Sequence, residues 1–277
     1  MIRDILVNLS LGSERDPAAV YAASLAAACK AHITGLAVSY EIDVPPFYMG
    51  ALPTDFIDQQ IRENEAAATT AAGAFTALAR EHGLSYDVRT LSGSLGDAAA
   101  AVGDLSRLYD LTVVAQPDPD RPGPEEVLAE SALMDSGRGV LVVPYVQKPP
   151  FSLSRVVVAW DGSRASARAL AESLPLLHMA DSRVIFSVRR SENEEATPNA
   201  ADLERHLAHH GLSAELRHLT IGSGESISSA ILNEVSDQGA DLVVMGGYGH
   251  SRVRELVFGG VTRDILGSMT APVLLAH

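Results

Sequence analysis

Glycines near the end of the chain have a spacing that could bind an anion. Residues 241–266 read DLVVMGGYGHSRVRELVFGGVTRDIL, with a glycine cluster at 246–249 and a pair at 259–260. A glycine inside a helix or strand costs about 0.5–1 kcal/mol relative to alanine, so clusters mark sharp turns or close approaches of the backbone. An apolar run precedes the cluster, and a segment of helical period follows the pair. Amides at such a loop and helix start can bind phosphate, so the stretch predicts a phosphate-binding loop.

Two similar segments indicate an internal duplication. The segment EHGLSYDVRTLSGSLGD, from Glu81, aligns without a gap with HHGLSAELRHLTIGSGE, from His209. Identical residues recur at one constant offset along both segments, and the alignment pairs Gly96 with Gly224. RDILVNLS also resembles SRVVVAWD, and YDLTVVAQ resembles ADLVVMGG. We therefore predict a tandem duplication.

Each half alternates apolar runs of strand length with alanine- and leucine-rich segments of helical period. The predicted strands are Ile5–Leu9, Ile33–Val38, Tyr86–Leu91, Leu111–Ala115 and Val140–Val143, then Val156–Trp160, Arg183–Val188, Ala214–Leu219, Leu242–Met245 and Val273–Ala276. Continuous apolar strands separated by helices indicate a parallel sheet that is covered on both faces. We therefore predict an α/β fold of two tandem, doubly wound, five-stranded, Rossmann-like domains. They span residues 1–146 and 147–277, and the proline-rich stretch 144–154 joins them.

Composition restricts the class of partner and the compartment. The formal net charge of -14 and the pI near 5.0 argue against a nucleic-acid-binding protein, which normally carries a basic face. No apolar run approaches the ~20 residues of a membrane span, and charges near the N-terminus do not fit a signal peptide, so we predict a cytoplasmic protein without membrane contact. The alanine-rich run around Cys29 favours a buried thiol over a reactive one.

The glycine spacing is similar to the nucleotide-binding signature of the universal stress protein family. That signature has glycine, two residues, glycine, nine residues, then glycine and a small residue, after a strand that ends in methionine. VVVAWDGSRASARAL also resembles the family's first strand and helix, and each half of the chain corresponds to a whole family domain. The resemblance to the tandem members implies an adenine nucleotide alpha hydrolase-like fold. It also implies two halves related by a pseudo-two-fold axis, with Val140–Val143 and Val273–Ala276 as antiparallel neighbours.

The resemblance further implies a site for an adenine nucleotide, ATP with or without Mg²⁺. The positions that match the family's binding residues are Ala159, Asp161, Val188, Met245, Gly246, Gly249, Gly259, Gly260 and Val261. The first three would lie against the ribose and the base, and the others would form the loop and helix start that hold the phosphates. The family prefers serine or threonine at the position of Gly260. The missing hydroxyl leaves weaker binding and no binding both open.

The first half departs much further from the signature. It has VAQPDPDRPGPEEVLAE in place of the glycine loop, with Gln116, Pro117, Asp118 and Asp120 in the loop region, and Ser10 stands in place of Asp161. Prolines remove amide donors and carboxylates repel phosphate. We therefore predict one nucleotide per chain, bound in the second half, and a structural or regulatory first half.

Other kinds of site have weaker support. The sequence contains no Walker pattern and no evident catalytic constellation, although slow nucleotide hydrolysis stays open. The histidines of one predicted helix and a nearby carboxylate could bind a metal, but ligands from a single exposed helix rarely close a site, so we predict that they are solvated. These residues are Asp202, His206, His209 and His210.

Further positions keep two interpretations. Tyr248, His250 and Arg252, in and after the glycine loop, could face phosphate or solvent. The proline- and aromatic-rich insertion at 40–61 could cap the sheet or act as a lid or partner surface. Three functions follow: a nucleotide-binding stress-response module with an unidentified protein partner, an interaction scaffold without ligand, and a weak nucleotide hydrolase. The sequence does not decide whether two chains associate.

Overall fold

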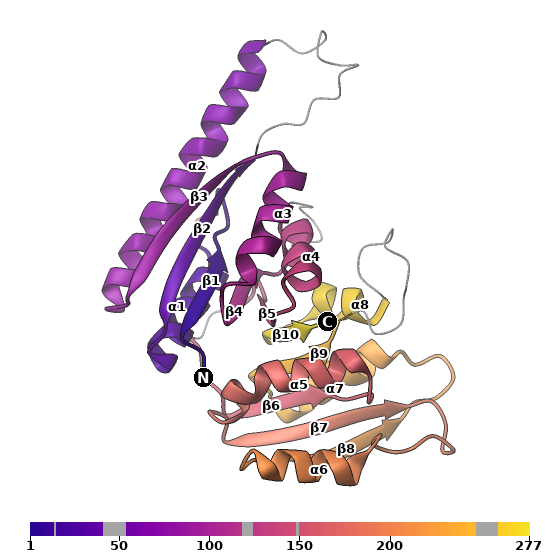
Figure 1. The fold of residues 1–277 in the computed structure, drawn as a ribbon. Coiled ribbons are helices and arrows are strands. Elements are labelled where there is room, and N and C mark those ends of the chain that lie inside the picture. The colour runs from indigo at the N-terminus through magenta and orange to yellow at the C-terminus, as the bar shows by residue number, and fades with distance from the viewer. Residues whose placement is uncertain (14, 41–53, 118–123, 148–149, 248–259) are drawn as a thin grey trace.

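The computed structural model describes residues 1–277 except 14, 41–53, 118–123, 148–149 and 248–259. Strands and helices alternate along both halves (Figure 1). The first half contains β1 (Asp4–Asn8), α1 (Pro17–Cys29), β2 (His32–Tyr40), α2 (Thr54–Glu81), β3 (Tyr86–Gly93), α3 (Leu95–Ser106), β4 (Leu111–Ala115), α4 (Glu125–Ser136) and β5 (Val140–Val143). The second half contains β6 (Arg155–Ala159), α5 (Arg164–Leu177), β7 (Ser182–Arg189), α6 (Ala200–His209), β8 (Glu215–Thr220), α7 (Ile227–Gln238), β9 (Leu242–Gly246), α8 (Gly260–Ser268) and β10 (Val273–Ala276).

All strands of the described ranges join one ten-stranded sheet in the order β3-β2-β1-β4-β5-β10-β9-β6-β7-β8. The pairing is parallel within each half and antiparallel only between β5 and β10, where Leu141 lies opposite Leu274. From either end of the sheet towards its centre, the equivalent strands of the two halves follow in the same order, as a pseudo-two-fold axis requires. The predicted α/β fold and the antiparallel contact between Val140–Val143 and Val273–Ala276 are both confirmed. Pairing these two strands also removes two sheet edges that would be open to aggregation.

Helices cover both faces of the sheet, and each layer spans both halves (Figure 1). One apolar cluster joins residues of α1, α2, α5 and α6 to one face, and a second joins residues of α3, α4, α7 and α8 to the other. β5 and β10 are buried along their whole lengths. Both apolar clusters therefore continue from one half into the other, and the boundary between residues 146 and 147 stays a prediction.

Side-chain caps explain where several helices begin. Asp16 caps α1 by accepting a hydrogen bond from the Ala19 amide, and Pro17 occupies the first helical position. Serines cap α3, α5 and α7 in the same way, namely Ser94, Ser163 and Ser226. These short polar residues fix the point at which each helix leaves the sheet.

The structure corrects one detail of the predicted duplication. Arg89 and Arg217 hold equivalent strand positions, since they pair with Leu36 and Phe186 on the neighbouring strands. The constant offset ends after these strands, because Gly96 lies inside α3 whereas Gly224 lies in the loop before α7, with φ +103°. The pairing of these two glycines was wrong, since the second half has a longer loop before its helix.

The sequence predicts a long helix from about Asp58 to His82. The observed helix α2 begins earlier, at Thr54, and extends beyond the sheet (Figure 1). Phe75 of α2 lies over β2 at Gly35, where an added Cβ would be 2.5 Å from the phenylalanine ring. That glycine lets the helix pack closely on the sheet. Most of the insertion lies at 41–53, outside the described residues, so its two interpretations stay open. Within the described ranges, no helix has both the length and the apolar character to cross a membrane.

Candidate functional site

A pocket of about 300 Å³ lies at the carboxyl ends of β6, β7 and β9, beside the start of α8. Its lining includes Ala159, Asp161, Val188, Met245, Gly246 and Val261. These residues come from separate segments that the sheet and α8 bring together. Carboxyl ends of strands next to a reversal of strand order are where open α/β sheets bind ligands. The sequence-predicted site residues that the structure describes therefore converge on one cavity, apart from Gly260.

Gly260 is exposed at the first position of α8 and is not among the residues that line the pocket. Among the atoms of the described residues, a Cβ added there would meet none within 4 Å, and Gly260 is not among the glycines with positive φ in that part of the chain. A side chain is therefore sterically and conformationally allowed at this position. Gly249 and Gly259 lie outside the described residues, as do Tyr248, His250 and Arg252.

A tight turn fixes Asp161 at the mouth of the pocket. Its Oδ1 accepts a hydrogen bond from the Ser163 amide at 2.9 Å, and Ser163 caps α5 by accepting from the Ser166 amide at 3.1 Å. Gly162 between them has φ +73°, and a Cβ there would lie 2.9 Å from the Pro198 side chain. The cap of α5 is therefore Ser163, and Asp161 shapes the turn that precedes it.

Packing explains the first two glycines of the cluster. A Cβ on Gly246 would lie 2.6 Å from the Ser166 amide nitrogen, which belongs to the backbone of α5. A Cβ on Gly247 would lie 3.0 Å from Leu133 of α4, across the boundary between the halves. The cluster does mark a close approach of the backbone, but at these positions the approach is to protein atoms.

Several pocket residues were missed by the sequence interpretation. Phe186 lies two residues before Val188 on β7, so the period of two along a strand could have identified it. Ile227 and Ile231 of α7 lie one helical turn apart on the pocket side. Trp160 also lines the pocket and donates its indole N–H to the Pro198 carbonyl at 2.8 Å. Together these residues give the pocket an apolar wall.

The loop after β7 contributes the charged rim of the pocket. Arg190 and Glu194 line it, and the Arg190 amide donates to the Glu194 carboxylate at 2.7 Å. Arg189 holds the same loop by pairing with Glu192 at 2.5 Å and donating to Thr220 at 2.7 Å. No sequence pattern placed this loop over the pocket, because its position depends on tertiary contacts.

Comparison with known proteins identifies the second half. A model described as the universal stress protein family matches residues 153–277. The C-terminal half of the chain belongs to the universal stress protein family. The universal stress protein Slr1230 of Synechocystis sp. is 31% identical over 126 residues, which cover 44% of this chain and 42% of that protein. The universal stress protein YxiE of Bacillus subtilis is 25% identical over 150 residues, 45% of this chain and 99% of that protein.

Solved structures extend the likeness to the whole fold. A universal stress protein from Archaeoglobus fulgidus matches 99% of this chain and 95% of its own, with a TM-score of 0.72 and 17% identity. A functionally unknown protein from Pseudomonas aeruginosa matches 99% of this chain and 92% of its own, with a TM-score of 0.63 and 16% identity. The N-terminal half therefore repeats the fold of the universal stress protein domain.

The equivalent end of the first half has different polar groups. Asn8 takes the place of Ala159, since the two pair with Leu36 and Phe186 on the neighbouring strands. The Asn8 side chain is 4% exposed, and its Oδ1 has no hydrogen-bond partner in the described structure. A buried amide thus occupies the position where the second half has the small apolar residue Ala159.

Gln116 connects the two halves. Its amide donates to Leu266 of α8 at 2.7 Å, and its side-chain oxygen accepts from the Tyr145 amide at 3.2 Å. Its position is equivalent to that of Gly247, because the backbone amides of both donate to the last residue of the neighbouring strand. Asp118 and Asp120 lie outside the described residues, and Ser10 donates its amide to Asp16 at 2.8 Å.

The predicted histidine helix is α6. His206, His209 and His210 are exposed, and the rings of His206 and His210 meet edge to face with centroids 4.7 Å apart. Asp202 pairs with Arg205. Among the residues that the structure describes, no group of three or more histidine, cysteine or acidic side chains could hold a metal ion. Cys29 is half-buried and lies 3.8 Å from the Met179 sulfur, and burial raises the pKa of its thiol.

Proposed function

We propose that the C-terminal half binds an adenine nucleotide, ATP in particular, and that the chain acts as a nucleotide-dependent switch or interaction module in a stress response. The observation that carries the proposal is the convergence of Asp161, Val188, Met245 and Val261 on one pocket. Spacing and family resemblance predict the same four residues from the sequence. Their common cavity supports a binding role.

The walls of the pocket suit the two ends of a nucleotide. Phe186, Val188 and Met245 offer apolar and aromatic surface to a base, as ligand pockets generally do. Val261 and Thr262, in the first turn of α8, also line the pocket. Amides at a helix start carry partial positive charge and can donate to phosphate.

Thr262 supplies a hydroxyl near the position where the family signature has one. It lies two residues after Gly260, is 4% exposed and lines the pocket. Its presence favours retained but weakened phosphate binding over complete loss. Where Mg²⁺ accompanies ATP, the phosphates themselves would supply ligands to the metal.

We propose that the chain consists of two domains, residues 1–146 and 147–277, and that the first domain has a structural or regulatory role. The buried Asn8 amide stands where the second half has Ala159, and the Gln116 side chain donates a hydrogen bond to the Leu266 carbonyl of α8. These groups change both the base side and the loop side of the equivalent crevice. We therefore propose one nucleotide per chain.

Mass spectrometry of nucleotide retained by the purified protein, followed by calorimetric titration with ATP, tests the proposal. One ATP per chain supports it. No detectable binding would indicate an interaction scaffold without ligand. Release of ADP and phosphate by the bound complex would instead indicate a hydrolase.

A further inference from the structure

The outer strand β3 presents an unpaired edge. It ends the sheet opposite β8 and pairs only with β2 among the described strands. Residues 87–90 are all exposed, and Val88 within this run is 36% exposed. An exposed strand edge presents unpaired N–H and C=O groups to another strand.

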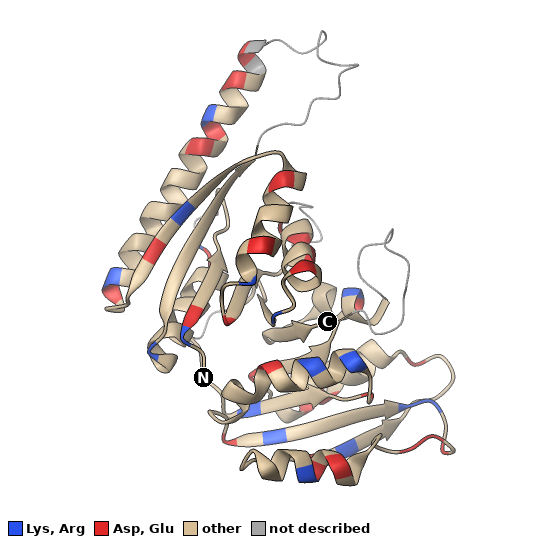
Figure 2. Cartoon of the chain, in the orientation of Figure 1, with Lys and Arg blue, Asp and Glu red and all other residues tan. Residues whose placement is uncertain are grey.

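Opposite charges lie on either side of Val88. Asp87 and Arg89 are two residues apart, so their side chains point to the same face of the sheet. Figure 2 shows acidic and basic positions close together along β3. Within the described part of the chain, Asp87 contacts His32 at 3.4 Å, and Arg89 interacts with the Asp4 carboxylate of β1 beyond ion-pair distance.

The strand at the opposite edge, β8, has the same order of an acidic and a basic residue, but its arginine has different partners. Arg217 of β8, equivalent to Arg89, lies 3.0 Å from Glu234 of α7 and 3.7 Å from Glu215 of its own strand. Val102 of α3 stands where α7 has Glu234, at the same distance from the capping serine. The arginine on β8 therefore has carboxylates at ion-pair distance within the described part of the chain, whereas the arginine on β3 has only the longer-range interaction with Asp4.

A hollow of about 600 Å³ adjoins β3 on the side of α3. Arg89 and Leu91 line it from the strand, and Asp104, Leu105 and Leu108 line it from α3 and the turn after it. Leu108 is 74% exposed. The hollow thus adds apolar surface to the exposed edge.

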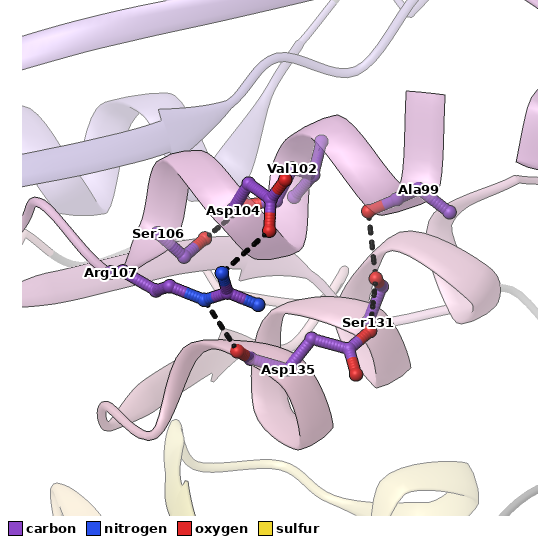
Figure 3. A network of polar contacts seen from close by, with 7 residues as sticks. All are labelled: Ala99, Val102, Asp104, Ser106, Arg107, Ser131 and Asp135. Carbon is purple, nitrogen blue, oxygen red and sulfur yellow. Dashed lines mark hydrogen bonds and ion pairs between the residues drawn. The ribbon is translucent and has the colours of Figure 1, made fainter. Parts of the chain in front are cut away.

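The wall of the hollow is held rigidly by contacts between α3 and α4 (Figure 3). Arg107 pairs with Asp104 at 2.8 Å and donates to the Asp135 carbonyl at 2.9 Å, and Ser131 donates to the Ala99 carbonyl at 2.7 Å. Gly103 permits this close packing, because a Cβ there would lie 2.9 Å from Asp135. The surface beside β3 is therefore preformed.

We propose that β3 pairs antiparallel with β3 of a second copy of this chain, about a two-fold axis at Val88. In that register Asp87 lies opposite the partner's Arg89, and Arg89 lies opposite the partner's Asp87. Directly opposed side chains on paired strands are about 4.5–5.5 Å apart at Cβ, which suits an ion pair. Moving the axis by one residue would place Arg89 opposite its own copy, so charge selects the register. The partner strand would also cover the hollow.

The proposal is tested by charge exchange on the full chain, with mass measured by sedimentation equilibrium over a wide concentration range. Unaltered protein should reach twice the 29.2 kDa chain mass. Arg89→Asp or Asp87→Arg alone replaces two attractions by two repulsions and should weaken the dimer roughly thirtyfold. The double variant Asp87→Arg with Arg89→Asp, and an equimolar mixture of the two single variants, should both restore it. Circular dichroism establishes that each variant is folded.

Glu215→Arg is the matched control on the other edge, and it should leave the dimer unchanged. A monomer at all concentrations would overturn the proposal. The edge of β3 would then be a candidate binding site for an extended peptide of another protein. A dimer that survives both single exchanges, or one lost in Glu215→Arg, would place the interface elsewhere. Open chains of increasing mass would indicate β3 pairing with β8 and would also refute it.

Discussion

Replacing Gly260 with serine tests how the start of α8 binds phosphate. The position begins the helix, and no atom of the described residues lies within 4 Å of a Cβ added there. Gly260 is also not among the described glycines with positive φ. Serine can therefore be added without strain, next to Val261, which lines the pocket. A hydrogen bond to a charged group contributes about 1.5–3 kcal/mol net, and the lower end of this range corresponds to a rise of about tenfold in ATP affinity.

The assay is calorimetric titration with ATP and with adenosine, on Gly260→Ser and on Gly260→Ala. Alanine removes the flexibility of glycine without adding a hydroxyl, so it separates helix stabilisation from phosphate contact. We expect a gain for serine alone and for ATP alone. An equal gain for adenosine, or an equal gain in the alanine variant, would show that the hydroxyl does not contact phosphate. A loss of ATP affinity in both variants would show that the loop needs glycine when nucleotide is bound.

Three further changes test the site and its support. Gly246→Ala should destabilise the protein by about 1–3 kcal/mol in urea unfolding, because the new Cβ would lie 2.6 Å from the α5 backbone. The control Gly260→Ala should be neutral or stabilising. Equal effects of the two substitutions would contradict the packing argument. Asp161→Asn keeps an acceptor for the Ser163 amide but removes the negative charge. The binding free energy of ATP should therefore weaken by about 1.5–3 kcal/mol, with little change in the free energy of unfolding. An unchanged ATP affinity would show that Asp161 only stabilises the turn before α5. Burial raises the pKa of the Asp16 carboxyl above its ordinary value of 3.8, so the folded state binds this proton more tightly than the unfolded state does. The contribution of Asp16 to the free energy of unfolding should therefore fall as pH rises from 3.8 through the folded pKa. Asp16→Asn should remove this pH dependence, and an unchanged dependence would refute the argument.

The sequence predicted the sheet well because its strands are continuous apolar runs between turn residues. Leu111–Ala115, Val140–Val143 and Val273–Ala276 are predicted and observed with the same bounds. Strand ends elsewhere differ by a residue or two, where hydrogen bonding rather than side-chain character sets the limit. The start of α2 was missed by more, because its first turns carry little apolar period.

The candidate site was partly predictable, for a physical reason. Asp161, Val188 and Met245 follow apolar strands, and the topology of a parallel sheet brings strand ends together. The reason for Gly246 was not predictable, because it depends on the backbone of α5, far away in sequence. The positions of Arg190 and Trp160 also depend on contacts with distant loops.

Titration of the full chain with ATP, by calorimetry on protein freed of retained nucleotide, tests the central claim most directly. The account predicts one ATP per chain, bound with an affinity that falls in Asp161→Asn. The absence of binding, or two equivalent sites per chain, would contradict it.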